Sequence, residues 1–110
     1  MSNSIKRRSF GRGKEPVLEV GFKNYVLCDR IVAIQDVSSL PVRRMRDRAL
    51  QSNLLVDASA GRKEKSVVIM DSGHVVISSI ASQTLAERLI NVTIYSALAE
   101  QEIEEGEFVS

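Results

Sequence analysis

The fold of this chain is decided by its middle, LLVDASAGRKEKSVVIMDSGHVVISSI, residues 54–80. Two compact apolar runs, Leu54–Val56 and Ser66–Met70, flank a polar loop, and the turn residues 71–74 lead into a third run, Val75–Ile80. Short runs rich in Val and Ile and bounded by turn residues are typical of β-strands. The stretch therefore predicts strand, loop, strand, turn and strand, with the loop at a hairpin tip.

The residues on either side predict further strands and two helices. Val17–Val20, Tyr25–Leu27 and Arg30–Gln35 have the composition of short strands. A helix capped by Ser38 or Ser39 is predicted to run to about Ser52, with a buried stripe at Val42, Met45 and Ala49 and with Pro41 in its first turn. A last helix starts near Ser82 or Thr84 and fades into a Glu-rich tail. The predicted class is α+β, a small single domain of short antiparallel strands with one mid-chain and one C-terminal helix.

Composition restricts the kind of protein. The chain has 110 residues, of which 44% are hydrophobic and 26% charged, as in a soluble single domain. Its longest apolar runs have four residues, whereas a membrane span needs about 20, and the basic start is not followed by the apolar stretch of a secretory signal. We therefore expect a cytoplasmic protein without membrane contact. With one cysteine and one histidine, no metal site or cofactor is expected.

Charge divides the chain into three parts. Residues 1–16 form a basic arm and residues 97–110 an acidic tail, both predicted to be flexible, around a domain at 17–96. Between Arg30 and Lys65, eight basic residues face four acidic ones. This surplus favours an anionic partner such as nucleic acid, although solvated surface charge is the more common role of any single basic residue.

The loop glycine, Gly61, stands directly before Arg62 and Lys63, and Lys65 follows. Glycine lets the backbone turn sharply, and an arginine fork beside a lysine suits the phosphates of a DNA backbone. On this pattern alone, a solvated turn is the more common alternative, and Glu64 dilutes the local positive charge.

Other arginines are weaker candidates. Four lie on the predicted mid-chain helix, where they suit either a groove contact or solubility: Arg43, Arg44, Arg46 and Arg48. Arg30 follows Asp29, so a local ion pair competes with a functional role.

No catalytic site is predicted. Cys28 and His74 are not brought together by any pattern, and we interpret them as a small buried residue and a turn residue. Asp57 and Asp71 each follow an apolar run, where turn capping is the expected use. We expect neither an enzyme nor a small-molecule substrate.

Residues 55–63 and 67–78 resemble the RemA family, the extracellular matrix regulatory proteins of bacteria. The resemblance extends from about Leu18 to Leu89, through Gly21-Phe22, Asn24, Arg30-Ile31, Ile34, Pro41, Arg43-Arg44, Thr84, Ala86 and Arg88-Leu89. It implies a LytTR-related α+β subunit that assembles into a ring and binds double-stranded DNA. Members regulate genes for biofilm matrix and osmotic stress, and association with the nucleoid is an open option for such a cytoplasmic regulator.

The resemblance also assigns site residues. The family's DNA-contacting arginine pair maps onto Arg62 and Lys63, and a further important arginine maps onto Arg30. Lysine keeps the charge at position 63 but lacks the bidentate fork. The predicted DNA-binding residues are Arg62, Lys63, Lys65, Arg30, Arg43 and Arg44.

A second interpretation is a homo-oligomeric scaffold that binds RNA or a protein. The five aromatic residues are scattered rather than gathered on a strand as a base-stacking platform, which disfavours RNA. Competition between duplex DNA and single-stranded RNA separates the two interpretations.

Overall fold

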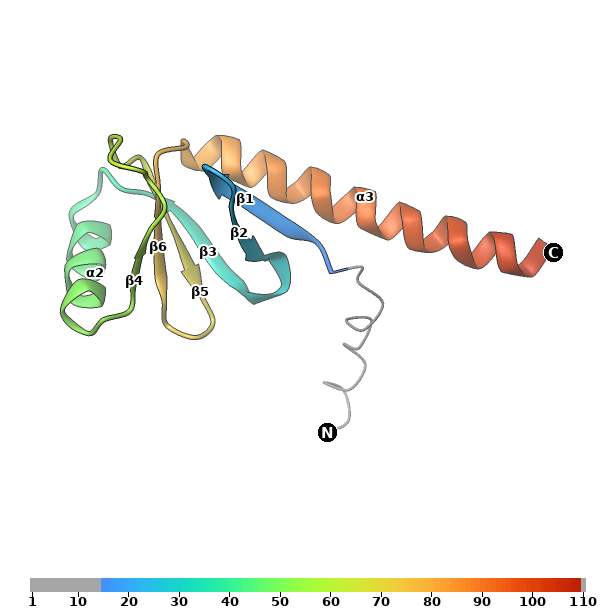
Figure 1. The fold of residues 1–110 in the computed structure, drawn as a ribbon, viewed down its shortest axis with the longest axis horizontal. Helices are drawn as coiled ribbons and strands as arrows, with labels where there is room; N and C mark the ends of the chain where they lie inside the picture. The colour runs from blue at the N-terminus through green and yellow to red at the C-terminus, as the bar shows by residue number, and fades with distance from the viewer. Residues whose placement is uncertain (1–14, 110) are drawn as a thin grey trace.

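The computed structural model describes residues 15–109, with side chains to Ala99 (Figure 1). Three strands and a short 3-10 turn come first, followed by a helix, three more strands and a long final helix. Their bounds are β1 Val17–Gly21, β2 Asn24–Leu27, η2 Cys28–Arg30, β3 Ile31–Asp36, α2 Leu40–Gln51, β4 Leu55–Asp57, β5 Ser66–Met70, β6 Val75–Ser78 and α3 Ser82–Val109. The predicted α+β class is confirmed.

Strands β1 and β2 form a separate antiparallel hairpin with a two-residue turn. Phe22 and Lys23 occupy that turn with φ of 50° and 64°, in the left-handed region that hairpin turns of this length require. The side-chain amide of Asn24 donates to the carbonyl of Gly21 at 2.9 Å and closes the turn. The hairpin tip is therefore a defined structure that exposes Phe22.

The remaining strands form one sheet in the order β3-β5-β6-β4. Strand β5 is antiparallel to β3 and β6, as predicted, but β4 runs parallel to β6. The tight turn 71–74 pairs β5 with β6, and β3 covers the other edge of β5, so β4 can pair only with the free edge of β6. The prediction that loop 58–65 is a hairpin tip is therefore wrong: the loop crosses from β4 to β5 past β6.

Both faces of this sheet are covered, because alternate side chains point to opposite sides of a strand. Val67, Val75 and Ile77 pack against Val42 and Ala49 of α2, in agreement with the predicted stripe. On the other face, a second cluster joins β1, the sheet and the start of α3: Leu18, Val20, Ala58, Val68, Val76 and Leu85. Figure 1 shows α2 on one side of the sheet and the hairpin with α3 on the other.

Helix α3 continues to Val109, past residue 96, where the sequence predicts a change from domain to tail. The reason is that Ala, Leu, Glu and Gln, which dominate this stretch, are all strong helix formers. The predicted basic arm lies almost entirely outside the described residues, and the flexibility of residues 97–110 stays a prediction. Within residues 15–109, neither α2 nor α3 has the length and apolar character needed to cross a bilayer.

Candidate nucleic-acid interface

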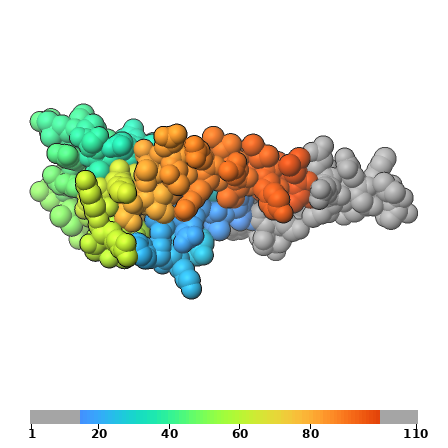
Figure 2. All heavy atoms as spheres, turned by 90° about the horizontal axis from the view of Figure 1, so that it is seen from above, coloured from blue at the N-terminus to red at the C-terminus, as the bar shows by residue number. Residues whose placement is uncertain are grey.

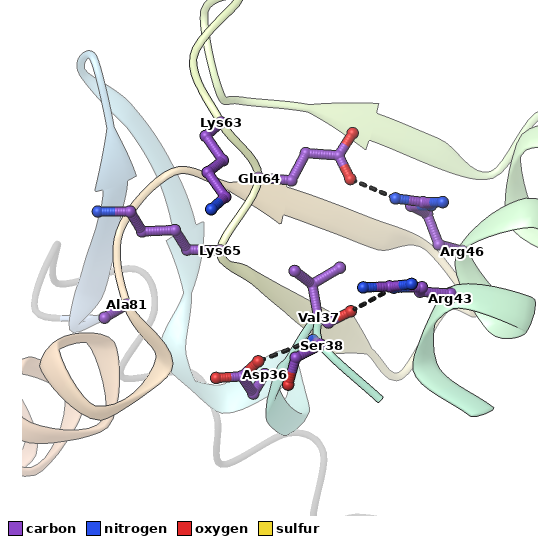
Figure 3. Close-up of a pocket in the computed structure, with 9 residues that line it drawn as sticks. All are labelled: Asp36, Val37, Ser38, Arg43, Arg46, Lys63, Glu64, Lys65 and Ala81. Atoms are coloured by element: carbon purple, nitrogen blue, oxygen red, sulfur yellow. Dashed lines mark hydrogen bonds and ion pairs between the residues drawn. The ribbon is translucent and has the colours of Figure 1, made fainter. Parts of the chain in front are cut away.

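An open groove of about 590 Å³ lies where the loop before β5 meets the end of β3 and the first half of α2 (Figure 3). Basic side chains dominate its rim, and two acids accompany them. The lining residues are Asp36, Val37, Ser38, Arg43, Arg46, Lys63, Glu64, Lys65 and Ala81. Figure 2 shows the loop, in yellow-green, at the surface beside the start of α3.

Helix α2 contributes Arg43 and Arg46 to the groove. These residues are three apart and so lie on one helix face, and Figure 3 shows both side chains extending from α2 toward the groove. The Nε of Arg43 donates to the carbonyl oxygen of Val37 at 3.2 Å, which leaves the outer guanidinium nitrogens for another acceptor. Arg46 is occupied, because its Nη1 donates to Glu64 at 2.5 Å and Asp47 lies 3.3 Å away. The hydrogen bond that Arg46 donates to the Glu64 carboxylate raises the pKa of Arg46, so this guanidinium stays charged.

The loop contributes Lys63 and Lys65 from a fixed backbone. The N–H of Lys65 donates to the carbonyl of Ser78 at 2.9 Å, and the Lys65 carbonyl accepts from Val37 N–H at 3.1 Å. Both lysine side chains are exposed, and neither makes an ion pair within residues 15–99. In Figure 3, Lys65 extends away from α2 on the side of Ala81. Two lysine charges are thus held at the groove rim for an external anion.

The groove also contains the acidic residue Asp36, at the end of β3, and its carboxylate is hydrogen-bonded within the chain. Asp36 accepts a hydrogen bond from Ser38 N–H at 2.7 Å. Hydrogen bonds from the hydroxyl and the N–H of Ser38 lower the pKa of the Asp36 carboxyl. Of the two predicted capping serines, Ser39 is the N-cap residue of α2, but its hydroxyl makes no capping hydrogen bond. The hydroxyl of Ser38 bonds to Asp36 instead. The chain enters α2 through this Asp36 turn.

Arg62 is held just outside the groove by a tight turn. The N–H of Arg62 donates to the carbonyl of Ser59 at 2.9 Å across Ala60 and Gly61, whose φ values are 53° and 78°. Asp57 accepts from the N–H and hydroxyl of Ser59 at 2.9 and 2.6 Å, which lowers the pKa of Asp57 and confirms its predicted turn-capping use.

The side chain of Arg62 turns toward the β1–β2 hairpin. Its guanidinium carbon lies 5.4 Å from the centre of the Phe22 ring, within the range of a cation–π contact. The charge of Arg62 therefore sits over the exposed hairpin tip, next to the lysines but not among the groove-lining residues.

The six predicted DNA-binding residues do not form one cluster. Lys63, Lys65 and Arg43 line the groove, Arg62 borders it, and Arg44 is exposed on α2 outside it. Arg30 lies at the other end of β5, roughly 20 Å away by strand geometry, since Lys65 precedes that strand and the Arg30 carbonyl bonds to Asp71 after it. Its ion-pair partner is Asp71, at 2.8 Å, rather than the neighbouring Asp29.

Arg30 borders a second open groove of about 570 Å³ between β2 and the β5–β6 turn. His74 also lines it, with Nδ1 2.7 Å from the hydroxyl of Ser72 in the turn. Cys28 packs half-buried against the core, where burial, helped by Asp29, raises the pKa of its thiol. Within the described residues no group of three potential metal ligands occurs. His74 lies at the β5–β6 turn, as predicted, whereas Cys28 is half-buried rather than fully buried.

Arg46 lines the groove and pairs with Glu64, but it is not among the DNA-binding residues predicted from the sequence. The signal was available, because Arg43 and Arg46 are three apart while Arg44 and Arg48 share a different helix face. The ion pair between Arg46 and Glu64 could not be predicted from the sequence, since the two residues are 18 positions apart and lie on different elements. This pair also corrects the expectation that Glu64 dilutes the lysine charges: Arg46 already neutralises it.

Comparison of the sequence with known proteins identifies a family. The family model described as "RemA-like: Extracellular matrix regulatory protein A-like" matches residues 17–89. A protein of Oleidesulfovibrio alaskensis named "Putative regulatory protein" is 43% identical over 77 residues, which cover 70% of this chain and 92% of that protein. A protein of the same name from Nitratidesulfovibrio vulgaris is 46% identical over 74 residues, covering 67% and 84%. A protein of Synechococcus elongatus, also named "Putative regulatory protein", is 42% identical over 77 residues, covering 70% and 88%.

Proposed function

We propose that this chain, which belongs to the RemA-like family, is a regulator that acts by binding double-stranded DNA rather than by catalysis. The names of its relatives support the regulatory role. DNA as the target is supported by the chemistry of the groove. The proposed contacts are Lys63, Lys65 and Arg43 in the groove and Arg62 beside it, with Arg30 and Arg44 supporting them on other faces.

The observation that carries the proposal is the convergence, on one open groove, of three cations from two elements that make no ion pair within residues 15–99. Lys63 and Lys65 come from the loop and Arg43 from α2, and Glu64 is paired with Arg46. Asp36 is hydrogen-bonded to Ser38 and keeps its negative charge, so three cations face one unpaired acid in the groove. Phosphates accept hydrogen bonds from ammonium and guanidinium groups, and each neutralised phosphate releases counterions. A duplex backbone supplies a row of phosphates along the groove.

Lysine at position 63 determines what kind of contact is proposed there. An ammonium is a point charge, whereas the arginine found in the family grips a phosphate or guanine edge with two parallel hydrogen bonds. We therefore assign Lys63 a phosphate contact without base recognition. Specificity for individual bases is expected to be low, and the shape and flexibility of the DNA matter more.

The three or four cations of a single subunit bind DNA only weakly. We therefore also propose that the subunits form a ring-shaped homo-oligomer, as the resemblance implies. Repeating the same contacts around a closed assembly raises the affinity through effective concentration and favours long or bent DNA. Target genes for biofilm matrix or stress responses follow from the resemblance alone.

The test is a fluorescence anisotropy titration of the protein against a long mixed-sequence duplex at two salt concentrations. The proposal predicts tight binding that falls steeply as salt rises, because several phosphates are neutralised together. Single-stranded RNA serves as the competitor. If RNA displaces the duplex at lower concentration, or if no duplex binding occurs at low salt, the proposal fails and the RNA- or protein-binding scaffold replaces it.

A further inference from the structure

The tip of the β1–β2 hairpin carries an exposed aromatic side chain, that of Phe22. A two-residue turn of this kind requires positive φ, which glycine and asparagine adopt with less strain than phenylalanine. Phe22 nevertheless has a φ of 50° and is 49% exposed, so its ring gains little stability from burial. A bulky residue kept in a strained and exposed position indicates a role other than stabilising the fold.

The ring of Phe22 contacts the guanidinium of Arg62. The guanidinium carbon lies 5.4 Å from the centre of the ring, and the Arg62 side chain makes no ion pair within residues 15–99. A cation–π contact uses the face of the ring and the positive charge of the cation. It engages none of the N–H donors of the guanidinium, whereas a carboxylate paired with arginine commonly occupies two of them. Arg62 is thus held in place while its donors stay available to a phosphate.

Both partners of this contact stand on a fixed backbone. On the hairpin side, the hydroxyl of Ser78 in β6 donates to the carbonyl of Val20 at 2.8 Å. A Cβ at Gly21 would lie 3.5 Å from the carbonyl oxygen of Ala58, so the hairpin backbone lies close to the loop. On the loop side, the tight turn before Arg62 bonds its N–H. Figure 2 shows the hairpin, in blue, protruding beside the loop, in yellow-green.

We propose that Phe22 is a positioning residue for DNA binding, because its ring holds the Arg62 guanidinium ready for a phosphate of the duplex. This role rests on the proposed function, since it refines how the same surface binds DNA. An arginine that is free in solvent loses rotamer freedom when it binds a phosphate, and this cost weakens binding. Contact with Phe22 restricts the side chain before the DNA arrives, so less freedom is lost on binding. Phe22 acts through Arg62 and does not itself touch the DNA.

Two variants of Phe22, each made in the full-length protein, test this role by anisotropy titration against the long duplex. Phe22→Asn removes the ring and supplies a residue type that the turn favours, so urea unfolding should require at least as much denaturant as for the parent. Its duplex affinity is expected to be lower by about two- to tenfold, because the Arg62 side chain must then be ordered on binding. Phe22→Tyr keeps the ring and should bind as the parent does. A residue that only stabilised the fold would lose stability and affinity together.

Arg62→Gln completes a double-mutant cycle. In the Arg62→Gln background, Phe22→Asn should cause no further loss of affinity, since no guanidinium remains to be positioned. Arg62→Gln should also lower the salt slope by about one per subunit contact, whereas Phe22→Asn keeps the charge and should leave the slope close to that of the parent. Tyr95→Leu, which removes an exposed ring on α3, is the matched control and should not change the affinity.

Parental affinity in Phe22→Asn overturns the positioning role and leaves the proposed function standing, because the parent still binds the duplex. A further loss in the Arg62→Gln background also overturns it, since the ring then contacts the DNA directly. If the parent itself does not bind the duplex, the proposed function fails and the positioning role fails with it.

Discussion

The carboxylate of Glu64 lies 2.5 Å from Nη1 of Arg46, and this pair fastens the loop before β5 to α2 across the candidate groove. Both side chains are about one-third exposed or less, so the pair is only partly screened by water. It removes one acid and one base from the electrostatics of the groove. Lys63 and Lys65, on either side of Glu64, are thereby left as net positive charge.

Replacing Glu64 by Gln is expected to strengthen DNA binding, because Arg46 becomes available and the groove gains one positive charge. The salt dependence should steepen by about one neutralised phosphate per subunit. Loss of the ion pair should lower the free energy of unfolding by about 0.2–1 kcal/mol, measured by urea denaturation. Arg46→Gln is the matched control, with a similar stability loss but weaker binding. Equal or weaker binding by Glu64→Gln would contradict the assigned role of the pair.

Gly61 is expected to be replaceable only at a cost in stability. Its φ of 78° is unfavourable for a residue with a Cβ, although no atom lies within 4 Å of where that Cβ would be. Gly61→Ala should therefore lower the free energy of unfolding by about 1–2 kcal/mol through backbone strain alone. Ala60→Gly, at the neighbouring left-handed position, should be nearly neutral because relieved strain and lost chain stiffness offset each other. A Gly61→Ala variant as stable as the parent would refute the turn geometry.

The hydrogen bonds from Ser59 to Asp57 predict a dependence of stability on acid. They lower the pKa of Asp57 in the folded chain below that in the unfolded chain, so their stabilisation is complete above the unfolded pKa of about 3.9. It is lost as pH falls through the folded pKa. In Ser59→Ala, the decrease in unfolding free energy between about pH 5 and pH 2 should be shallower, since Asp57 keeps only its backbone partner. Parallel pH profiles for the two proteins would exclude this linkage.

Variants of the ion pair between Arg30 and Asp71 distinguish a structural role of Arg30 from a DNA-binding role. Their side chains are 55% and 44% exposed, so Arg30→Gln and Asp71→Asn should each reduce stability by less than about 1 kcal/mol. If Arg30 supports DNA binding, the two variants should change duplex affinity in opposite directions, weaker for Arg30→Gln and stronger for Asp71→Asn. Anisotropy titrations measure both. The same change in both variants would limit Arg30 to holding the β5–β6 turn.

Much of the fold is readable from local sequence because it depends on local physics. The strands around residues 54–80 and the stripe at Val42, Met45 and Ala49 follow from periodicity and turn residues, and both are found in the structure. The parallel pairing of β4 with β6 is not local. This pairing depends on which strand edge remains free after β3, β5 and β6 have paired. The sequence of β4 itself does not indicate which edge that is.

The candidate site divides in the same way. Lys63 and Lys65 are found through the loop pattern. The contacts that α2 makes are not, because Arg46–Glu64 joins α2 to the loop and Arg43–Val37 joins α2 to the residue after β3. The position of Arg62 over Phe22 likewise depends on two turns meeting in space. Sequence identifies the charged residues, and the tertiary fold decides which of them share a surface.

The most direct test of the central claim compares the duplex affinity of Lys63→Gln with that of Arg48→Gln. Each variant removes one positive charge from an exposed residue, but Lys63 lines the groove and Arg48 does not. The account predicts at least about a tenfold loss of affinity and a salt slope lower by about one per subunit contact for Lys63→Gln. Arg48→Gln should stay within about twofold of the parent protein. Equal losses for the two variants would show that binding follows net charge alone, and would contradict the groove as the DNA-binding site.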